Sequence, residues 1–317
     1  MEIKGLSKKN IEKISKIKNE EKFFQDYRLN SYEIFKKLDN PHFGPRYDID
    51  YNKIVYYKND IKTLSNNWNN VSCAIKDEFQ NLGVIDSEKE MDGLGVQYES
   101  EMIYHNMIDE LEKKKVIFTS IDEAIKNYPQ LVKKYFGKIV SNRDNKFAAL
   151  NGCVFSGGSF IYIPPYTSLD RPLQSYFRIN SRNMGQFERS LIIVDHNSSL
   201  HYIEGCTAPE YSDSSLHAAV VEIFVGKNST CRYSTVQNWS NNVYNLVTKR
   251  ALVEEDGVME WIDGNIGSHV TMKYPACILK GDNASGTCIT ISVASTNQEQ
   301  DTGARMIHIG KNTKSKI

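Results

Sequence analysis

The chain has 317 residues, of which 40% are hydrophobic and 25% charged, so it can bury a sizeable core and divide into two units. Lysine plus arginine equals aspartate plus glutamate at 39 each, so charge gives no reason to expect nucleic acid or a membrane as partner. The N-terminus lacks the apolar run of a signal peptide, and no segment reaches transmembrane length. These features indicate a globular protein.

The first 150 residues show mainly helical periodicity. Apolar residues recur at helical spacing over three segments, and capping signals open two shorter helices. The expected helices lie within residues 7–37, 71–82, 100–115, 120–128 and 129–136. A segment rich in proline and glycine, residues 39–45, interrupts the pattern. We therefore predict a mainly helical N-terminal domain over residues 1–150.

After Leu150 the strand-like alternation of apolar and polar residues replaces the helical period, and it defines a second domain over residues 151–317. Polar turns recur in this domain with a period of about 28 residues. They contain Asn197, Asn228, Asn283 and Asn312, and Glu255-Asp256-Gly257 divides the longest gap. Spacing of this kind is typical of a solenoid.

A repeat of strand, turn and strand without intervening helices predicts a parallel β-helix, in which each coil covers the apolar face of the previous coil. A β-sandwich is the alternative on pattern alone. The predicted fold class is therefore α+β, a helical domain followed by a β-helix. Residues 306–317 begin another coil and no cap follows, so we expect the coil stack to be incomplete at Ile317.

Cys206 is the strongest candidate for chemistry. It follows Gly205 at the end of an alternating pattern, and Pro209 stops the ladder, so we expect the thiol at a bend at a strand end. Exposure and nearby positive charge make a thiol nucleophilic, and Arg178 and Lys249 are candidates to supply that charge from other coils. The alternative is that Cys206 is a small buried packing residue.

The other candidate motifs are weak. The six cysteines contain no CxxC or CxxxC pair, which indicates neither a zinc site nor a disulfide framework and favours a reducing compartment. No two histidines have metal-binding spacing, and only His217, beside Ala218-Ala219-Val220, is a candidate for a functional imidazole. No GxxxxGK[ST] segment occurs, so intrinsic ATP hydrolysis by a P-loop is not expected.

Five sequence blocks carry a resemblance to a known family. They are Tyr176–Asn180, Gly185–Arg189, Tyr202–Cys206, Ser234–Trp239 and Val247–Leu252. With these blocks the chain closely resembles the SufB/SufD family of iron–sulfur cluster assembly scaffolds, from the N-terminal helices to the block that ends at residue 308. The resemblance implies a helical N-terminal region followed by a right-handed parallel β-helix, in agreement with the repeat.

The resemblance also implies roles for particular residues. In that family the cysteine of the Tyr-Ile-Glu-Gly-Cys block is thought to accept persulfide sulfur, and the matching residue is Cys206. Polar residues of the solenoid interior are linked to sulfur transfer, and the matching residues are Arg178, Asn180, Gln237, Trp239 and Lys249. Cationic and amide side chains of this kind stabilise a thiolate or persulfide anion.

The partners implied by the resemblance are the SufC ATPase, SufD, a cysteine desulfurase system as sulfur donor, and apo-proteins that receive a transient iron–sulfur cluster. A homodimer of the chain is compatible with it, and the chain is expected to be a scaffold more than an enzyme. The family continues into coils with a second cysteine and an acidic–histidine cluster, then a SufC-docking domain. Cluster ligation and ATPase docking are therefore in doubt for residues 1–317, and the metal ligands stay unassigned.

Two other functions fit the pattern less well. A structural member of the same assembly would contribute a solenoid without chemistry of its own. A carbohydrate-active β-helix enzyme would need converging carboxylates, for which Asp195, Glu204 and Glu222 are candidates. The bias towards Lys, Asn, Ile and Tyr, with no targeting segment, suggests a plastid-type, apicoplast-like organelle that encodes the protein, with a bacterial cytoplasm as the alternative.

Overall fold

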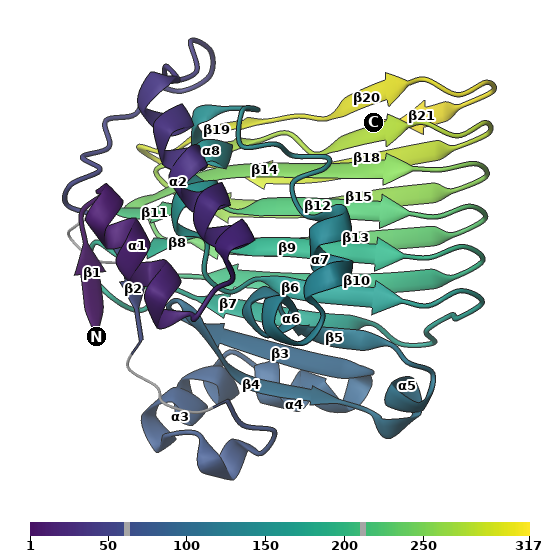
Figure 1. Ribbon diagram of the computed structural model, residues 1–317, viewed down its shortest axis with the longest axis horizontal. Helices are drawn as coiled ribbons and strands as arrows, with labels where there is room; N and C mark the ends of the chain where they lie inside the picture. The colour runs from purple at the N-terminus through teal and green to yellow at the C-terminus, as the bar shows by residue number, and fades with distance from the viewer. Residues whose placement is uncertain (60–63, 210–213) are drawn as a thin grey trace.

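Two sheets of parallel strands stack along one axis and form a β-solenoid, with the coils following each other from the teal to the yellow end of the chain (Figure 1). The computed structural model describes residues 1–59, 64–209 and 214–317. Each coil contributes one strand to an eight-stranded first sheet and one or two strands to an eleven-stranded second sheet. This arrangement confirms the predicted β-helix and excludes the β-sandwich.

The strands of the solenoid are long in the first sheet and shorter in the second. The first sheet contains β7 (Leu173–Arg178), β10 (Ser199–Thr207), β13 (Thr230–Trp239), β15 (Val258–Gly267), β18 (Ser285–Val293) and β21 (Lys314–Lys316). The second contains β6 (Ser159–Ile163), β8 (Gly185–Gln186), β9 (Arg189–Val194), β11 (Ser215–His217), β12 (Val220–Val225), β14 (Val243–Val253), β16 (Val270–Lys273), β17 (Ala276–Leu279), β19 (Glu299–Thr302) and β20 (Arg305–His308).

A left-handed residue marks the same turn in successive coils, as the turn repeat predicts. Asn197, Asn228, Asp256, Asn283 and Asn312 have φ between 53° and 59°. Asparagine and aspartate adopt this conformation more readily than other residues with a side chain. The turns also stack: the Asn228 amide donates to Oδ1 of Asn197 at 3.1 Å, and that of Asn283 to Oδ1 of Asp256 at 3.0 Å.

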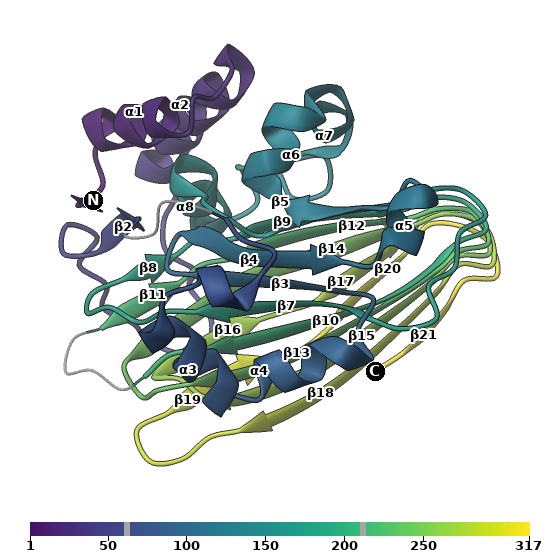
Figure 2. The ribbon, with the colours of Figure 1, turned by 90° about the horizontal axis from the view of Figure 1, so that it is seen from below.

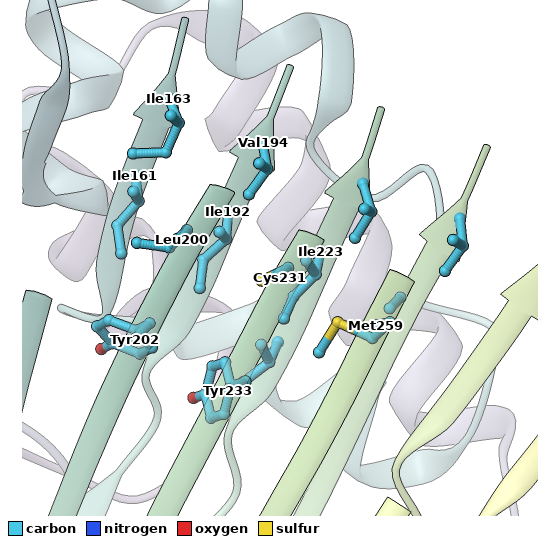
Figure 3. Close-up of a cluster of buried hydrophobic side chains, with 14 of the residues drawn as sticks. Ile161, Ile163, Ile192, Val194, Leu200, Tyr202, Ile223, Cys231, Tyr233 and Met259 are labelled. Atoms are coloured by element: carbon cyan, nitrogen blue, oxygen red, sulfur yellow. The ribbon is translucent and has the colours of Figure 1, made fainter. Parts of the chain in front are cut away.

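The interior next to these turns is apolar. Figure 3 shows side chains from neighbouring coils aligned in rows, with Leu200 of the first sheet beside Ile161 and Ile192 of the second. Rows of β-branched and aromatic residues fill this half of the solenoid because alternate residues of each strand point inward. Cys231 lies within this core, fully buried among apolar side chains.

Helices cover the outer face of the second sheet (Figures 1 and 2). They are α1 (Lys8–Ile17), α2 (Lys22–Lys37), α6 (Ile121–Asn127), α7 (Pro129–Tyr135) and α8 (Lys146–Val154). The predicted start signals are confirmed, because the Ser120 hydroxyl caps α6 at the Glu123 amide and Pro129 begins α7. On the other flank lie α3 (Cys73–Asn81), α4 (Val84–Ser87), η1 (Trp68–Asn70) and η2 (Glu88–Glu90), whereas α5 (Asp109–Lys113) packs Leu111 against the apolar core of the solenoid.

The helix expected over residues 100–115 is wrong for most of its length. Glu101–Met107 forms strand β4, which pairs antiparallel with β3 (Gly93–Tyr98), and only α5 follows. Ile103 and Tyr104 are consecutive residues of β4 and point to opposite faces of the strand, and both are buried in the cluster that contains Trp68. Partner strands therefore override the apparent helical spacing.

The N-terminal part also contributes strands to the solenoid. β3 pairs parallel with β7 and extends the first sheet, and β5 (Ile117–Ser120) pairs antiparallel with β6 and extends the second. A separate two-stranded antiparallel sheet pairs β1 (Glu2–Lys4) with β2 (Val55–Lys58). Every helix of the described residues is too short or too polar to cross a bilayer. The division into domains at residue 150 stays a prediction.

Candidate functional site

Cys206 is the next-to-last residue of β10, and its side chain points into the solenoid with only 1% of its surface exposed. Its neighbours across the coils are Phe177 on β7 and Gln237 on β13. The thiol is therefore near a strand end, as expected, but it is neither exposed nor at a bend. Burial of the thiol therefore corrects the expectation that Cys206 is exposed.

Gly205 has a different role from the one expected, because it lies within β10 with ordinary strand geometry. The ring of Tyr176 covers it, and a Cβ atom on Gly205 would lie 2.6 Å from Cδ2 of that ring. Glycine is thus needed for close approach of an aromatic side chain on the outer face of the first sheet.

Two inward-facing rows continue from the cysteine along the first sheet. The parallel register places Cys206, Gln237, Asn265 and Ser292 in one row. The neighbouring row contains Glu204, Thr235, Asp263 and Thr290. Because parallel coils repeat in register, polar residues at equivalent positions form a continuous polar strip inside the solenoid.

A third polar row faces this strip from the second sheet. His217 on β11, Asn245 on β14 and Thr271 on β16 are in register and almost fully buried. The two sheets are joined across the interior, where Asn245 Nδ2 donates to Oε1 of Gln237 at 3.0 Å. Gln237 in turn donates from Nε2 to the Cys206 sulfur at 3.9 Å. We call these three rows, together with the buried charged side chains of Glu188, Lys249 and Lys273 that contact them, the polar interior.

Two buried lysines lie in the polar interior. The ammonium of Lys249 is 3.6 Å from Oε1 of Glu204 and 3.8 Å from Oδ1 of Asp263. Lys273 pairs with Asp263 at 3.0 Å and donates to Oδ1 of Asn265 at 3.0 Å. Buried charges need partners of this kind, because an unpaired charge loses its hydration without compensation.

The electrostatics of the thiol follow from these neighbours. Burial raises the pKa of Cys206 well above its usual range, and the charges of Glu204 and Glu188 raise it further. Lys249 and Lys273 act in the opposite direction and lower it. In the resting structure Cys206 is therefore a protonated thiol, and the expectation of an exposed, low-pKa thiolate is corrected.

His217 and Lys273 also respond to burial. For His217, burial alone would lower the pKa, but Glu188 at 2.9 Å from Nε2 and Asn245 at 2.7 Å from Nδ1 outweigh it and raise the pKa. Burial lowers the pKa of Lys273 to about 8, against the opposing charge of Asp263. The Asp263 carboxyl has a lowered pKa, because the two lysines outweigh the effect of its burial.

The structure brings only some of the predicted site residues together. Gln237 and Lys249 belong to the polar interior, and Trp239 packs in the same buried cluster as Cys206, 4.8 Å from the His217 ring. The Trp239 indole N–H is buried and has no hydrogen-bond partner within the part of the chain that the structure describes.

Arg178 and Asn180 lie apart from the polar interior. The Arg178 guanidinium contacts Glu78 at 2.6 Å and Oγ1 of Thr207 at 2.9 Å, on the opposite face of β7 from Phe177. Asn180 follows β7, where its side chain donates to the Tyr98 hydroxyl. The expectation that Arg178 supplies charge to Cys206 is thus wrong, since its charge is neutralised by Glu78.

Sequence reasoning missed several members of the polar interior. They are Glu188, Asn245, Asp263 and Lys273. A signal was present in β15, where Met259, Trp261, Asp263 and Asn265 alternate in one inward-facing row. A carboxylate among the inward-facing residues of a strand indicates a buried cationic partner, because an interior position seldom holds a charge without one.

The three carboxylates considered for a carbohydrate-active enzyme do not converge. Asp195 pairs with His196 near the surface, and Glu204 lies in the polar interior. Glu222 pairs with Arg189 beneath the helices. Within residues 1–59, 64–209 and 214–317, no group of three or more His, Cys, Asp or Glu side chains is placed to hold a metal ion.

The fold and the site together define a class of protein: a parallel β-solenoid whose interior holds a thiol, two lysines and acidic partners. Two sequence-family profiles match this chain. Residues 177–317 match the profile described as "SUF system FeS cluster assembly, SufBD core domain", and residues 97–175 match "SufBD protein N-terminal region".

Curated relatives show the same family. The iron–sulfur cluster assembly protein SufB of Bacillus subtilis is 50% identical over 316 residues, which cover 99% of this chain and 68% of that protein. An iron–sulfur cluster assembly SufBD family protein of Staphylococcus aureus strain MRSA252 is 52% identical over the same shares. The chain therefore belongs to the SufB/SufD family of iron–sulfur cluster assembly proteins.

Proposed function

We propose that this chain is a scaffold subunit that receives sulfane sulfur at Cys206 and holds it in the polar interior while a cluster is built. The observation that carries the proposal is the register of Cys206 with Gln237 and Asn265, beside the ammonium groups of Lys249 and Lys273. Cations and amide donors around a sulfur stabilise a persulfide anion. The indole N–H of Trp239 in the same cluster adds a donor that has no acceptor among the described residues.

The partners belong to the same proposal. Membership in a SUF assembly family supports a complex with SufD and the SufC ATPase, with sulfur from a cysteine desulfurase and transfer of a transient iron–sulfur cluster to apo-proteins. The cluster is cargo in this scheme. A homodimer is an alternative assembly. The relatives described above are bacterial, which favours a bacterial cytoplasm over a plastid-type organelle.

One observation favours a second function. The Cys206 thiol is buried and protonated, which suits a structural subunit whose solenoid supports chemistry elsewhere in the assembly. Under that alternative the thiol is a packing residue, and Cys206→Ser leaves sulfur uptake by the chain unchanged.

The experiment measures transfer of ³⁵S from a persulfide-loaded cysteine desulfurase to the protein, followed by non-reducing electrophoresis. We expect the wild type to gain label and Cys206→Ser to lose nearly all of it. Cys231→Ser is the matched control, because Cys231 is equally buried, on the neighbouring β13, but in the apolar core. Equal labelling of Cys206→Ser and wild type would rule out the acceptor role.

A further inference from the structure

Glu204 is the one acidic side chain that contacts the Cys206 sulfur in the described part of the chain. The two residues are separated by one position on β10, so both side chains point into the solenoid. The thiol donates to Oε1 of Glu204 at 3.8 Å. The backbone of a paired strand fixes this geometry, since β10 is held in register on both sides.

Sulfur uptake by a buried thiol requires removal of its proton, because the thiolate is the nucleophile. Several ionisable groups face Cys206 from the elements packed around it. They are Glu204 and Tyr202 on β10, Glu188 before β9, Tyr233 on β13, Lys249 on β14 and Lys273 on β16, with Tyr176 on the outer side of β7. The lysines are donors, and Glu188 is paired with His217. Gln237 contacts the sulfur but only donates to it.

Glu204 has the surroundings of a proton acceptor. Oε2 accepts a hydrogen bond from the Tyr233 hydroxyl, so Oε1 is the oxygen left to face the thiol. Lys249 lies 3.6 Å from that oxygen and provides a positive charge beside both the carboxylate and the sulfur. A negative charge can thus move from oxygen to sulfur without leaving the neighbourhood of the cation.

Glu222 shows what a purely structural buried carboxylate looks like in this fold. Its oxygens accept backbone N–H groups of Gly137, Ile139 and Val140 and pair with Arg189 at 2.8 Å. All its partners are donors fixed by the fold. Glu204 differs because one of its partners is a thiol that can give up its proton.

We propose that Glu204 is the general base that activates Cys206 for sulfur transfer, an inference that rests on the proposed acceptor function. Glu204 takes the thiol proton, and the Cys206 thiolate attacks the terminal sulfane sulfur of a donor persulfide, R–S–SH. A new S–S bond forms at Cys206 as the donor S–S bond breaks, which leaves Cys206–S–SH and R–S⁻. The proton then passes from Glu204 to R–S⁻, so no external oxidant or reductant is consumed.

The test compares initial rates of ³⁵S transfer from a small alkyl persulfide to wild type and Glu204→Gln between pH 6 and 9. General base catalysis contributes roughly 10²–10⁴-fold, so we expect Glu204→Gln to be at least about 100-fold slower at pH 7. Its rate should rise about tenfold per pH unit, because hydroxide then removes the proton. The final extent of labelling at pH 9 should match that of wild type.

Glu260→Gln is the control for loss of a carboxylate, since Glu260 pairs with Arg232 on the outer face of the first sheet. Glu204→Asp, which keeps the acid but shortens its reach, should give an intermediate rate and covers the case that Glu204→Gln fails to fold. A wild-type rate and pH profile in either Glu204 variant would overturn the inference. Loss of the acceptor function itself is recognised separately, by labelling of Cys206→Ser.

Discussion

At the scale of single residues, three consecutive positions of β10 have different roles. Within β10, Glu204 and Cys206 face the polar interior, and Gly205 between them faces outward beneath Tyr176. The alternation of a strand separates chemistry from packing over three consecutive positions. The Tyr-Ile-Glu-Gly-Cys block thus combines a thiol, its acidic neighbour and the space for an aromatic ring.

Gly205→Ala should destabilise the protein by about 1–3 kcal/mol, because the added methyl group overlaps the Tyr176 ring. The measurement is the midpoint of urea unfolding. Gly264→Ala is the matched control, since Gly264 is the equivalent residue two coils along and its Cβ would meet only a carbonyl oxygen at 3.6 Å. Equal shifts in the two variants would show that overlap with Tyr176 is not the cause.

At the scale of elements, the coil is defined by its turns and by the register that they impose. The left-handed turns at Asn197, Asn228 and Asn283 stack through their amides and through the backbone, as in the bond from Asn228 N to Glu255 O at 3.0 Å. Each turn therefore keeps the strands of the next coil in register with those of the coil before it. A shift by one residue would turn every polar side chain of the interior outward.

Asn228→Ala should lower the stability by about 1–2 kcal/mol, because alanine resists the left-handed conformation that this turn requires. Asn228→Gly adopts the turn freely and loses only the amide bond to Asn197, so its unfolding midpoint should lie between those of wild type and Asn228→Ala. A Gly variant as unstable as the Ala variant would mean that the side-chain ladder, and not the backbone conformation, dominates.

At the scale of the whole molecule, one buried ion pair on the second sheet binds the helical flank to the solenoid through hydrogen bonds. Glu222 on β12 accepts the backbone N–H groups of residues that follow α7, and its partner Arg189 on β9 also contacts Asn151 of α8. Both charged side chains are about 1% exposed. The helices are thus bound to the second sheet by a charge network as well as by apolar packing.

Glu222→Ala should cost about 3–5 kcal/mol, because it leaves the Arg189 charge buried without its partner. The loss should appear as a lower urea midpoint and as faster proteolysis within residues 129–154. The double variant Arg189→Met, Glu222→Leu removes both charges and should recover part of the loss. A single variant with wild-type midpoint and proteolysis rate would show that the pair does not hold the flank.

The sequence by itself determined the coil repeat, its turn residues and the helices α1, α2, α6 and α7, and it singled out Cys206 and His217 as candidates. These features depend on local signals such as turn chemistry, capping and periodicity. Only the tertiary structure decided that Glu101–Met107 is a strand, that Cys206 is buried, and that Arg178 faces Glu78. The same alternation allows either face of a strand to point inward, and the neighbouring coils decide which one does.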